Sequence, residues 1–260
     1  MEACYIGIDI GSTTTKVVVI DNNKTIVSSD ITATSSNPSR VAKFILDRVL
    51  KKAGNPKVKI IVATGYGRYA IPFADKAITE ITCHAVGVFT LNKQARTIID
   101  IGGQDSKVIK LDDFGNIENF KMNDKCAAGT GKFLEIIANR LEVKLEEFGQ
   151  LALRSKRPSQ ISSVCAVFAE SEVISLLASG VNKIDIAAGI HLAIANRIGA
   201  MVSSLGIKKE VIFTGGVAKN PGVKFFLEKV LNTKILLPKI PPYFTGAYGA
   251  AILGLKSMRS

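Results

Sequence analysis

The sequence predicts an α/β protein built from two duplicated domains, and three observations support this fold class. First, shifting the chain by 91 residues, the distance from Asp9 to Asp100, aligns Asp9–Gly11 with Asp100–Gly102 and Lys16 with Lys107. Second, each copy opens with an apolar run that turns at glycine and returns as a second β-rich run. Third, helical patterns follow these runs, and strands alternating with helices are typical of α/β layers.

The first elements of each copy are predicted to be three strands in a meander. Near-continuous apolar runs indicate buried strands, and a polar turn separates the second strand from the third. The predicted strands are Tyr5–Ile10, Lys16–Ile20 and Thr25–Ile31 in the first copy, and Thr97–Ile101, Ser106–Leu111 and Asn116–Met122 in the second.

The helices are predicted from apolar residues that recur at helical spacing. They are Pro38–Gly54, Gly131–Leu141, Phe168–Ser179, Lys183–Leu205 and Gly222–Leu231, with a short strand, Val211–Thr214, before the last, and a close-packed Ala- and Gly-rich helix over Tyr243–Leu255. We expect a first domain of residues 1–95, joined by the C-terminal segment 243–260, and a second domain of residues 96–242.

The composition is that of a globular protein with a sizeable core, since 47% of the 260 residues are hydrophobic and 22% are charged. No apolar run approaches the ~18 residues of a membrane span, so we expect a cytoplasmic protein with no membrane segment. The net charge is +12, but the basic residues are dispersed and aromatic residues are few, so we expect no nucleic-acid partner. A basic face that docks an acidic protein is an alternative use of this charge.

Both predicted hairpin turns carry residues that suit phosphate binding. The first hairpin turn reads Asp9-Ile-Gly-Ser-Thr-Thr-Thr-Lys16, and the second reads Asp100-Ile-Gly-Gly-Gln-Asp-Ser-Lys107. Glycine lets the backbone approach an anion closely, and successive turn amides form a cradle for phosphate oxygens. Asp9 and Asp100 could hold Mg²⁺ through its waters. The candidate phosphate-binding residues are Gly11, Ser12, Thr13, Thr14 and Lys16 in the first turn, and Gly102, Gly103 and Asp105 in the second.

A third glycine turn, at Gly215 and Gly216, follows a predicted strand and opens a helix, with Lys219 close behind. An adenosine could lie against its bare backbone. Two other nucleotide motifs are excluded. Residues 126–132 lack the leading glycine of a Walker loop, and residues 65–68 lack the third glycine of a dinucleotide fingerprint.

In order and spacing, these three turns resemble those of the superfamily of actin, sugar kinases and heat-shock chaperone ATPases. The resemblance implies an actin-like fold, with two duplicated domains and a nucleotide cleft between them. It implies ATP and ADP as ligands.

Cys126 and Cys165 each lie shortly before a predicted helix. A helix N-terminus stabilises a thiolate or an anionic metal–sulfur cluster. A cluster usually needs four thiolates, so a twofold dimer in which each subunit gives two would complete the set. Two alternatives stay open on the residues alone: both cysteines could be small buried residues, or the four could bind zinc.

The cysteine blocks and six further motifs closely resemble the activators of 2-hydroxyacyl-CoA dehydratases over nearly the whole chain. The related benzoyl-CoA reductase ATPase subunits and the reductases of double-cubane cluster proteins share this likeness. The six motifs are Ala63–Arg68, Ala74–Lys76, Glu80–His84, Asp100–Asp105, Phe168–Glu172 and Gly215–Ala218.

The resemblance implies a homodimer that holds one [4Fe–4S] cluster through Cys126 and Cys165 of each subunit. It implies an ATPase that accepts electrons from ferredoxin or flavodoxin and delivers them to an acceptor dehydratase or a double-cubane cluster protein. We expect Asp100 and Gln104 to orient the attacking water and Asp9 to support Mg²⁺.

The remaining cysteines and histidines are assigned no ligand role. Cys4 is expected in the core of the first strand, Cys83 and His84 on an apolar helix face, and His191 within a helix. The rival functions are a small-molecule kinase of the same fold and a zinc-stapled dimeric nucleotide-binding scaffold.

Overall fold

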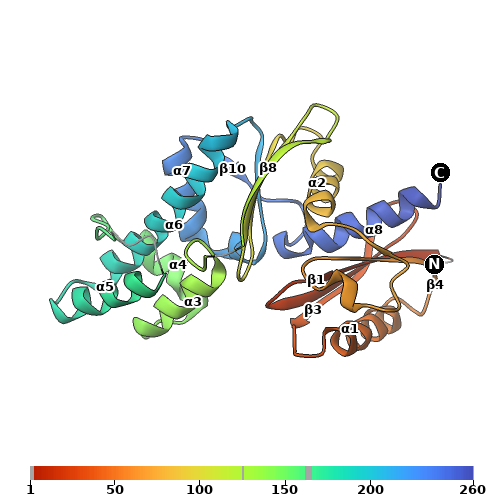
Figure 1. Cartoon of the computed structure of the whole chain (residues 1–260), viewed down its shortest axis with the longest axis horizontal. Helices are drawn as coiled ribbons and strands as arrows, with labels where there is room; N and C mark the ends of the chain where they lie inside the picture. The colour runs from red at the N-terminus through yellow and green to blue at the C-terminus, as the bar shows by residue number, and fades with distance from the viewer. Residues whose placement is uncertain (1–2, 125, 162–165, 260) are drawn as a thin grey trace. The chain divides into compact units, whose positions relative to one another are not determined.

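The computed structural model describes residues 3–124, 126–161 and 166–259. The chain is an α/β protein that divides into two compact units (Figure 1). The first unit contains Met1–Arg96, Leu111–Glu118 and Pro238–Ser260, and the second contains Thr97–Lys110 and Asn119–Leu237.

The first unit is built on a five-stranded sheet in the order β3-β2-β1-β4-β5. Its central strand β1 pairs antiparallel with β2 and parallel with β4. The strands are β1 (Ala3–Ile10), β2 (Thr14–Ile20), β3 (Ile26–Ala33), β4 (Lys57–Thr64) and β5 (Lys76–Ala77).

Helices cover both faces of this first sheet, so every residue of β1 is buried. Ile6 and Ile8 belong to a core shared with α1 (Pro38–Lys52), which begins at the capping side chain of Asn37. On the other face β1 packs against α8 (Thr245–Ser257), which also contacts α2 (Glu80–Leu91). A Cβ on Gly7 would lie 1.8 Å from a carbonyl oxygen of α8, so only glycine allows this close approach.

The second unit contains a sheet with the same arrangement, in the order β10-β9-β6-β7-β8. Its central strand β6 pairs antiparallel with β7 and parallel with β9, as β1 does with β2 and β4. The strands are β6 (Thr97–Ile101), β7 (Ser106–Leu111), β8 (Ile117–Asn123), β9 (Val211–Thr214) and β10 (Ile235–Leu236). The duplication predicted from the sequence is therefore present in the strand order of both sheets.

The second core lies between this sheet and a group of helices around α6 (Lys183–Leu205). The other helices are α3 (Gly131–Arg140), α4 (Leu145–Leu153), α5 (Ala166–Ala178) and α7 (Pro221–Leu231). By length and composition alone α6 could cross a membrane. The sequence analysis had expected no apolar run of that length. Because most of its apolar stretch is buried inside the structure, α6 has the character of a core helix.

The predicted strands and helices are confirmed with shifts of a few residues at their ends. Strand β4, the two-residue strands β5 and β10 and helix α4 were not predicted, and α2 was expected only as the helix that carries Cys83 and His84. Helix α4 has only nine residues, which gives its apolar spacing little weight. Strand β4 was missed because two exposed lysines, Lys57 and Lys59, interrupt its apolar run.

Candidate functional site

The two hairpin turns predicted to bind phosphate close in the same way. In the first turn the Gly11 amide donates to the Thr14 carbonyl at 3.0 Å, and in the second the Gly102 amide donates to the Asp105 carbonyl at 2.9 Å. Each turn joins the central strand of its sheet to the neighbouring antiparallel strand. The repeat therefore extends from residue types to hydrogen bonds.

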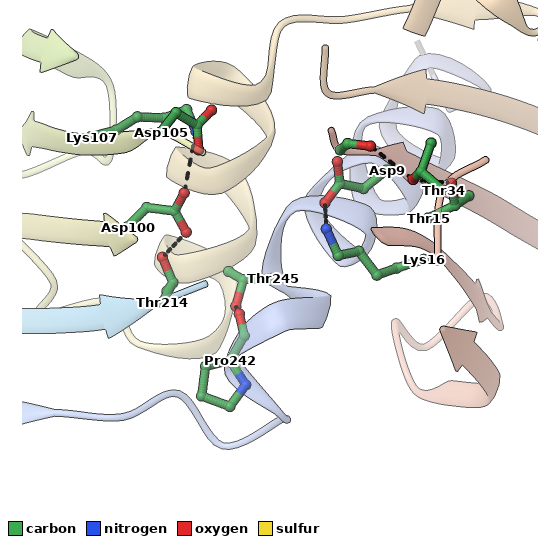
Figure 2. A network of polar contacts seen from close by, with 11 residues as sticks. Asp9, Thr15, Lys16, Thr34, Asp100, Asp105, Lys107, Thr214, Pro242 and Thr245 are labelled. Atoms are coloured by element: carbon green, nitrogen blue, oxygen red, sulfur yellow. Dashed lines mark hydrogen bonds and ion pairs between the residues drawn. The ribbon is translucent and has the colours of Figure 1, made fainter. Parts of the chain in front are cut away.

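In the first turn, the hydroxyl-bearing residues Ser12 and Thr13 are exposed at the tip. Thr34 supports the turn from the end of β3, because its hydroxyl donates to the Gly11 carbonyl at 2.8 Å and its amide donates to the Thr13 carbonyl at 2.9 Å. Figure 2 shows Thr34 beside Thr15. The exposed hydroxyls are thus presented on a backbone that is held in place.

Asp9 lies near the end of β1 and forms an ion pair with Lys16, with 3.1 Å between the carboxylate and the ammonium (Figure 2). Both side chains are largely buried, at 11% and 13% exposure. An ion pair with so little solvent around it is screened less than a surface pair. The structure thus places these two predicted site residues together.

The second turn carries a denser set of charges. The Lys107 ammonium lies 2.7 Å from a carboxylate oxygen of Asp105 and 3.4 Å from one of Asp100. The Thr214 hydroxyl donates to the other oxygen of Asp100 at 2.8 Å (Figure 2). Gln104 is exposed at the tip of the turn. Lys107 and Thr214 were not among the predicted site residues.

The third glycine turn follows β9 and packs against the second hairpin turn. Gly215 has a φ of +87°, and a Cβ there would lie 2.3 Å from the Ile101 carbonyl oxygen, so the position requires glycine. Gly216 is exposed, and a Cβ on it would meet nothing within 4 Å. Lys219 is also exposed and ends the short helix η2 (Gly216–Lys219). The bare backbone expected for an adenosine is thus accessible.

A fourth glycine turn follows β4 in the first unit, within residues 65–68, which the sequence analysis excluded as a dinucleotide fingerprint and did not include among the site residues. Gly65 has a φ of +86°, and a Cβ there would lie 2.6 Å from the Ile10 carbonyl oxygen. This is the counterpart of Gly215, since Thr-Gly follows an apolar strand in both places. That shared dipeptide was the available signal.

Cys126 is partly buried and lies in a loop before α3. The Asn123 side chain donates to the Cys126 carbonyl at 2.9 Å. At the start of α3, the Gly131 amide donates to the Gly102 carbonyl at 2.9 Å and the Lys132 amide donates to the Gly103 carbonyl at 2.8 Å. The second hairpin turn, α3 and the Cys126 loop are therefore joined within one unit. Cys165, the other predicted cluster ligand, lies outside the described residues.

The other two cysteines of the described chain are fully buried in the first unit. Burial raises the pKa of the Cys4 thiol to about 11 and that of the Cys83 thiol to about 12. Such thiols stay protonated near neutral pH, and a metal ligand must be a thiolate. The described residues contain no group of three or more metal-ligating side chains.

His191 packs in the core of the second unit. Its Nδ1 lies 2.7 Å from the Ala187 carbonyl and its Nε2 lies 3.2 Å from the Asn220 side chain. Burial lowers its pKa to about 4. These contacts indicate a structural histidine.

A family model described as the BadF/BadG/BcrA/BcrD ATPase family matches residues 6–254. The chain is 46% identical over 251 residues to a 2-hydroxyisocaproyl-CoA dehydratase activator from Clostridioides difficile, covering 95% of this chain and 92% of the relative. It is 45% identical to an (R)-2-hydroxyglutaryl-CoA dehydratase activating ATPase from Acidaminococcus fermentans, covering 98% of each. It is 33% identical to one of the subunits of benzoyl-CoA reductase from Thauera aromatica, covering 95% of this chain and 92% of the relative.

Solved structures extend the likeness to the fold. The activator of the 2-hydroxyisocaproyl-CoA dehydratase from Clostridium difficile, with bound ADPNP, superposes with a TM-score of 0.92 at 43% identity, covering 98% of this chain and 96% of that one. A glucokinase from Streptomyces griseus superposes with a TM-score of 0.59 at 16% identity, covering 97% of this chain and 99% of that one. The latter likeness shows only that the fold is shared with actin-like sugar kinases.

Proposed function

Because this chain belongs to the BadF/BadG/BcrA/BcrD ATPase family, we propose that it is an ATP-dependent activator that delivers electrons to a partner enzyme. Two of its relatives are named as an activator and an activating ATPase of 2-hydroxyacyl-CoA dehydratases. The proposed acceptor is a dehydratase of this kind or a double-cubane cluster protein, and the proposed donor is ferredoxin or flavodoxin. The proposed setting is the cytoplasm.

Each hairpin turn by itself offers groups that suit the phosphates of a nucleotide. The Ser12 and Thr13 hydroxyls and the turn amides suit phosphate oxygens, and the exposed Gly216 backbone suits the adenosine. A carboxylate such as that of Asp9 or of Asp100 suits a hydrated Mg²⁺, which retains most of its waters and needs few direct protein ligands. We assign Asp9 to support of that ion, and Asp100 with Gln104 to orientation of the attacking water.

The proposed redox group is one [4Fe–4S] cluster held by Cys126 and Cys165 of two subunits. Cys126 fits this role because it is partly exposed and in no disulfide, whereas the buried Cys4 and Cys83 thiols stay protonated. When bound, the cluster supplies one-electron transfer.

The observation that supports this proposal most is that the start of α3 is hydrogen-bonded to the backbone of the second hairpin turn. Carbonyl groups of Gly102 and Gly103 accept from the first two amides of α3, close to Cys126. A shift of that turn with nucleotide state would therefore move the start of α3 and, with it, the Cys126 loop. A nucleotide can shift the equilibrium between two conformations only if it makes different contacts in each.

The test is anaerobic purification followed by iron, sulfide and zinc analysis and an assay of ATP-dependent electron delivery. We expect a brown dimer with about four irons per dimer, and Cys126→Ala or Cys165→Ala should remove the iron. Cys4→Ala is the matched control and should keep it. A colourless dimer with stoichiometric zinc would favour the scaffold, and phosphate transfer to a sugar would favour the kinase.

A further inference from the structure

Asp100 lies at the centre of a group of cross-strand neighbours. In the register of the second sheet, Asp100 on β6 is opposite Lys107 on β7 and Thr214 on β9. Directly opposed residues have closely spaced Cβ atoms, so their side chains can meet. Three strands, one of them distant in sequence from the other two, thus place these side chains together.

Each carboxylate oxygen of Asp100 has its own partner. The Lys107 ammonium lies 3.4 Å from one oxygen, and the Thr214 hydroxyl donates to the other at 2.8 Å. The Asp100 and Lys107 side chains are only 5% and 4% exposed. Two partners on opposite oxygens fix both the position and the rotation of the carboxylate.

The same register occurs in the first unit, but its contacts differ. Asp9 is opposite Lys16 on β2 and Thr64 on β4. Among the described contacts the buried Thr64 hydroxyl makes no hydrogen bond to Asp9, whereas Lys16 forms an ion pair with it. The full arrangement therefore belongs to Asp100, and strand pairing alone does not produce it.

The second turn also has one more acidic residue around its lysine. Asp105 stands where the first turn has Thr14, and its carboxylate lies 2.7 Å from the Lys107 ammonium. Without that ammonium, the two carboxylates would repel each other at a poorly solvated site. Lys107 thus offsets this repulsion and holds the Asp100 carboxylate in place.

We propose that Lys107 and Thr214 are positioning residues for ATP hydrolysis, which hold the Asp100 carboxylate in one orientation from opposite sides. This inference rests on the proposed function, which assigns Asp100 to the attacking water. Neither residue is required to touch the nucleotide. Their loss should therefore lower kcat more than it raises KM.

The first experiment compares two threonines of the same sheet by steady-state ATP hydrolysis of the anaerobically purified full-length protein. Thr214→Val keeps the shape and removes the hydroxyl. We expect kcat to fall about 10-fold or more, because a misplacement of about 1 Å can cost about 100-fold, with little change in KM. Thr97→Val is the control, since the Thr97 hydroxyl donates to the Lys208 carbonyl instead. It should retain kcat.

The second experiment compares two lysines of β7. Lys107→Met should lower kcat with little change in KM, and Lys107→Arg, which keeps the charge, should recover part of the loss. Lys110→Met is the control, because the Lys110 ammonium donates to the Leu205 carbonyl. If Thr214→Val does not fold, the lysine comparison decides the question.

Two failures can be told apart. If the unaltered protein hydrolyses ATP and both Thr214→Val and Lys107→Met keep its kcat, the positioning role is wrong and the proposed function stands. If the unaltered protein does not hydrolyse ATP with or without its partner, the proposed function fails. A loss of kcat in Thr97→Val equal to that in Thr214→Val would also overturn the inference.

Discussion

At the scale of single residues, the two aspartates near the ends of the central strands carry the proposed catalysis. Asp9 and Asp100 are both buried, and each forms an ion pair with the lysine opposite it in register. Carboxylates held in this way contribute a fixed negative charge and little apolar packing. Their substitution should affect turnover more than folding.

We expect Asp9→Asn and Asp100→Asn each to lower ATP hydrolysis by about 100-fold, as is common when a group positioned for catalysis is lost. Both variants should still fold, because asparagine keeps the size of the side chain, although the melting temperature should fall where a largely buried ion pair is broken. Turnover and thermal unfolding are measured together. Asp113→Asn, at an exposed ion pair with Arg96, is the control and should leave both unchanged. Wild-type turnover in Asp100→Asn would contradict its assigned role.

His191 should make stability depend on pH. Its folded pKa of about 4 lies below the unfolded value near 6.5, so the unfolded state binds more protons between these values. Stability should therefore fall as the pH drops from about 6.5 to about 4, by at most roughly 3 kcal/mol from this group. Urea unfolding at several pH values measures the slope. His191→Gln should flatten it, and an unchanged slope would show that other groups dominate.

At the scale of elements, the start of α3 connects the second hairpin turn with the cysteine loop. A Cβ on Gly131 would lie 3.1 Å from the Gly102 carbonyl oxygen and 3.2 Å from the Val217 side chain. These contacts are tight, so glycine allows the helix to approach the turn closely. The first amides of α3 donate hydrogen bonds to carbonyl groups of the turn, and no side chain among the described residues caps the helix.

Gly131→Ala should therefore loosen this junction, at a cost of about 1–3 kcal/mol for overpacking. We expect faster hydrogen exchange at the Gly131 and Lys132 amide positions and weaker ATP-dependent electron delivery. Lys132→Ala keeps its amide and is the control. Equal exchange rates in the two variants would show that the junction does not depend on the glycine.

At the scale of the whole molecule, nucleotide binding and cluster state should be coupled in both directions. If exchanging ATP for ADP changes the equilibrium of cluster reduction or of partner docking by some factor, then reduction or docking must change the ratio of ATP to ADP affinity by the same factor. This reciprocity holds for any pair of linked binding equilibria.

We expect the ratio of ATP to ADP affinity to differ by about 5-fold or more between the oxidised and reduced protein. Anaerobic calorimetry in both oxidation states, with and without a candidate acceptor, measures it. Cys126→Ala, which should lack the cluster, is the control and should show one ratio throughout. Identical ratios in the unaltered protein would contradict coupled electron delivery.

The sequence alone was sufficient to predict the duplicated α/β fold, the two hairpin turns and the family. These features depend on local patterns: near-continuous apolar runs, glycine at the turns that follow them, and a repeat that can be aligned without knowing any contact. Strand β4 was missed because its two exposed lysines, Lys57 and Lys59, interrupt its apolar run.

Only the tertiary structure identified which residues surround each aspartate. Lys107 was visible in the repeat as the partner of Lys16, but Thr214 is 114 positions from Asp100. Its hydroxyl reaches Asp100 because parallel pairing of β6 and β9 sets their register. The bonding of α3 to the second hairpin turn likewise joins backbone groups, and backbone hydrogen bonds between distant segments leave no signature in residue type. Register and close approach are properties of the packed chain, so they were decided by the fold.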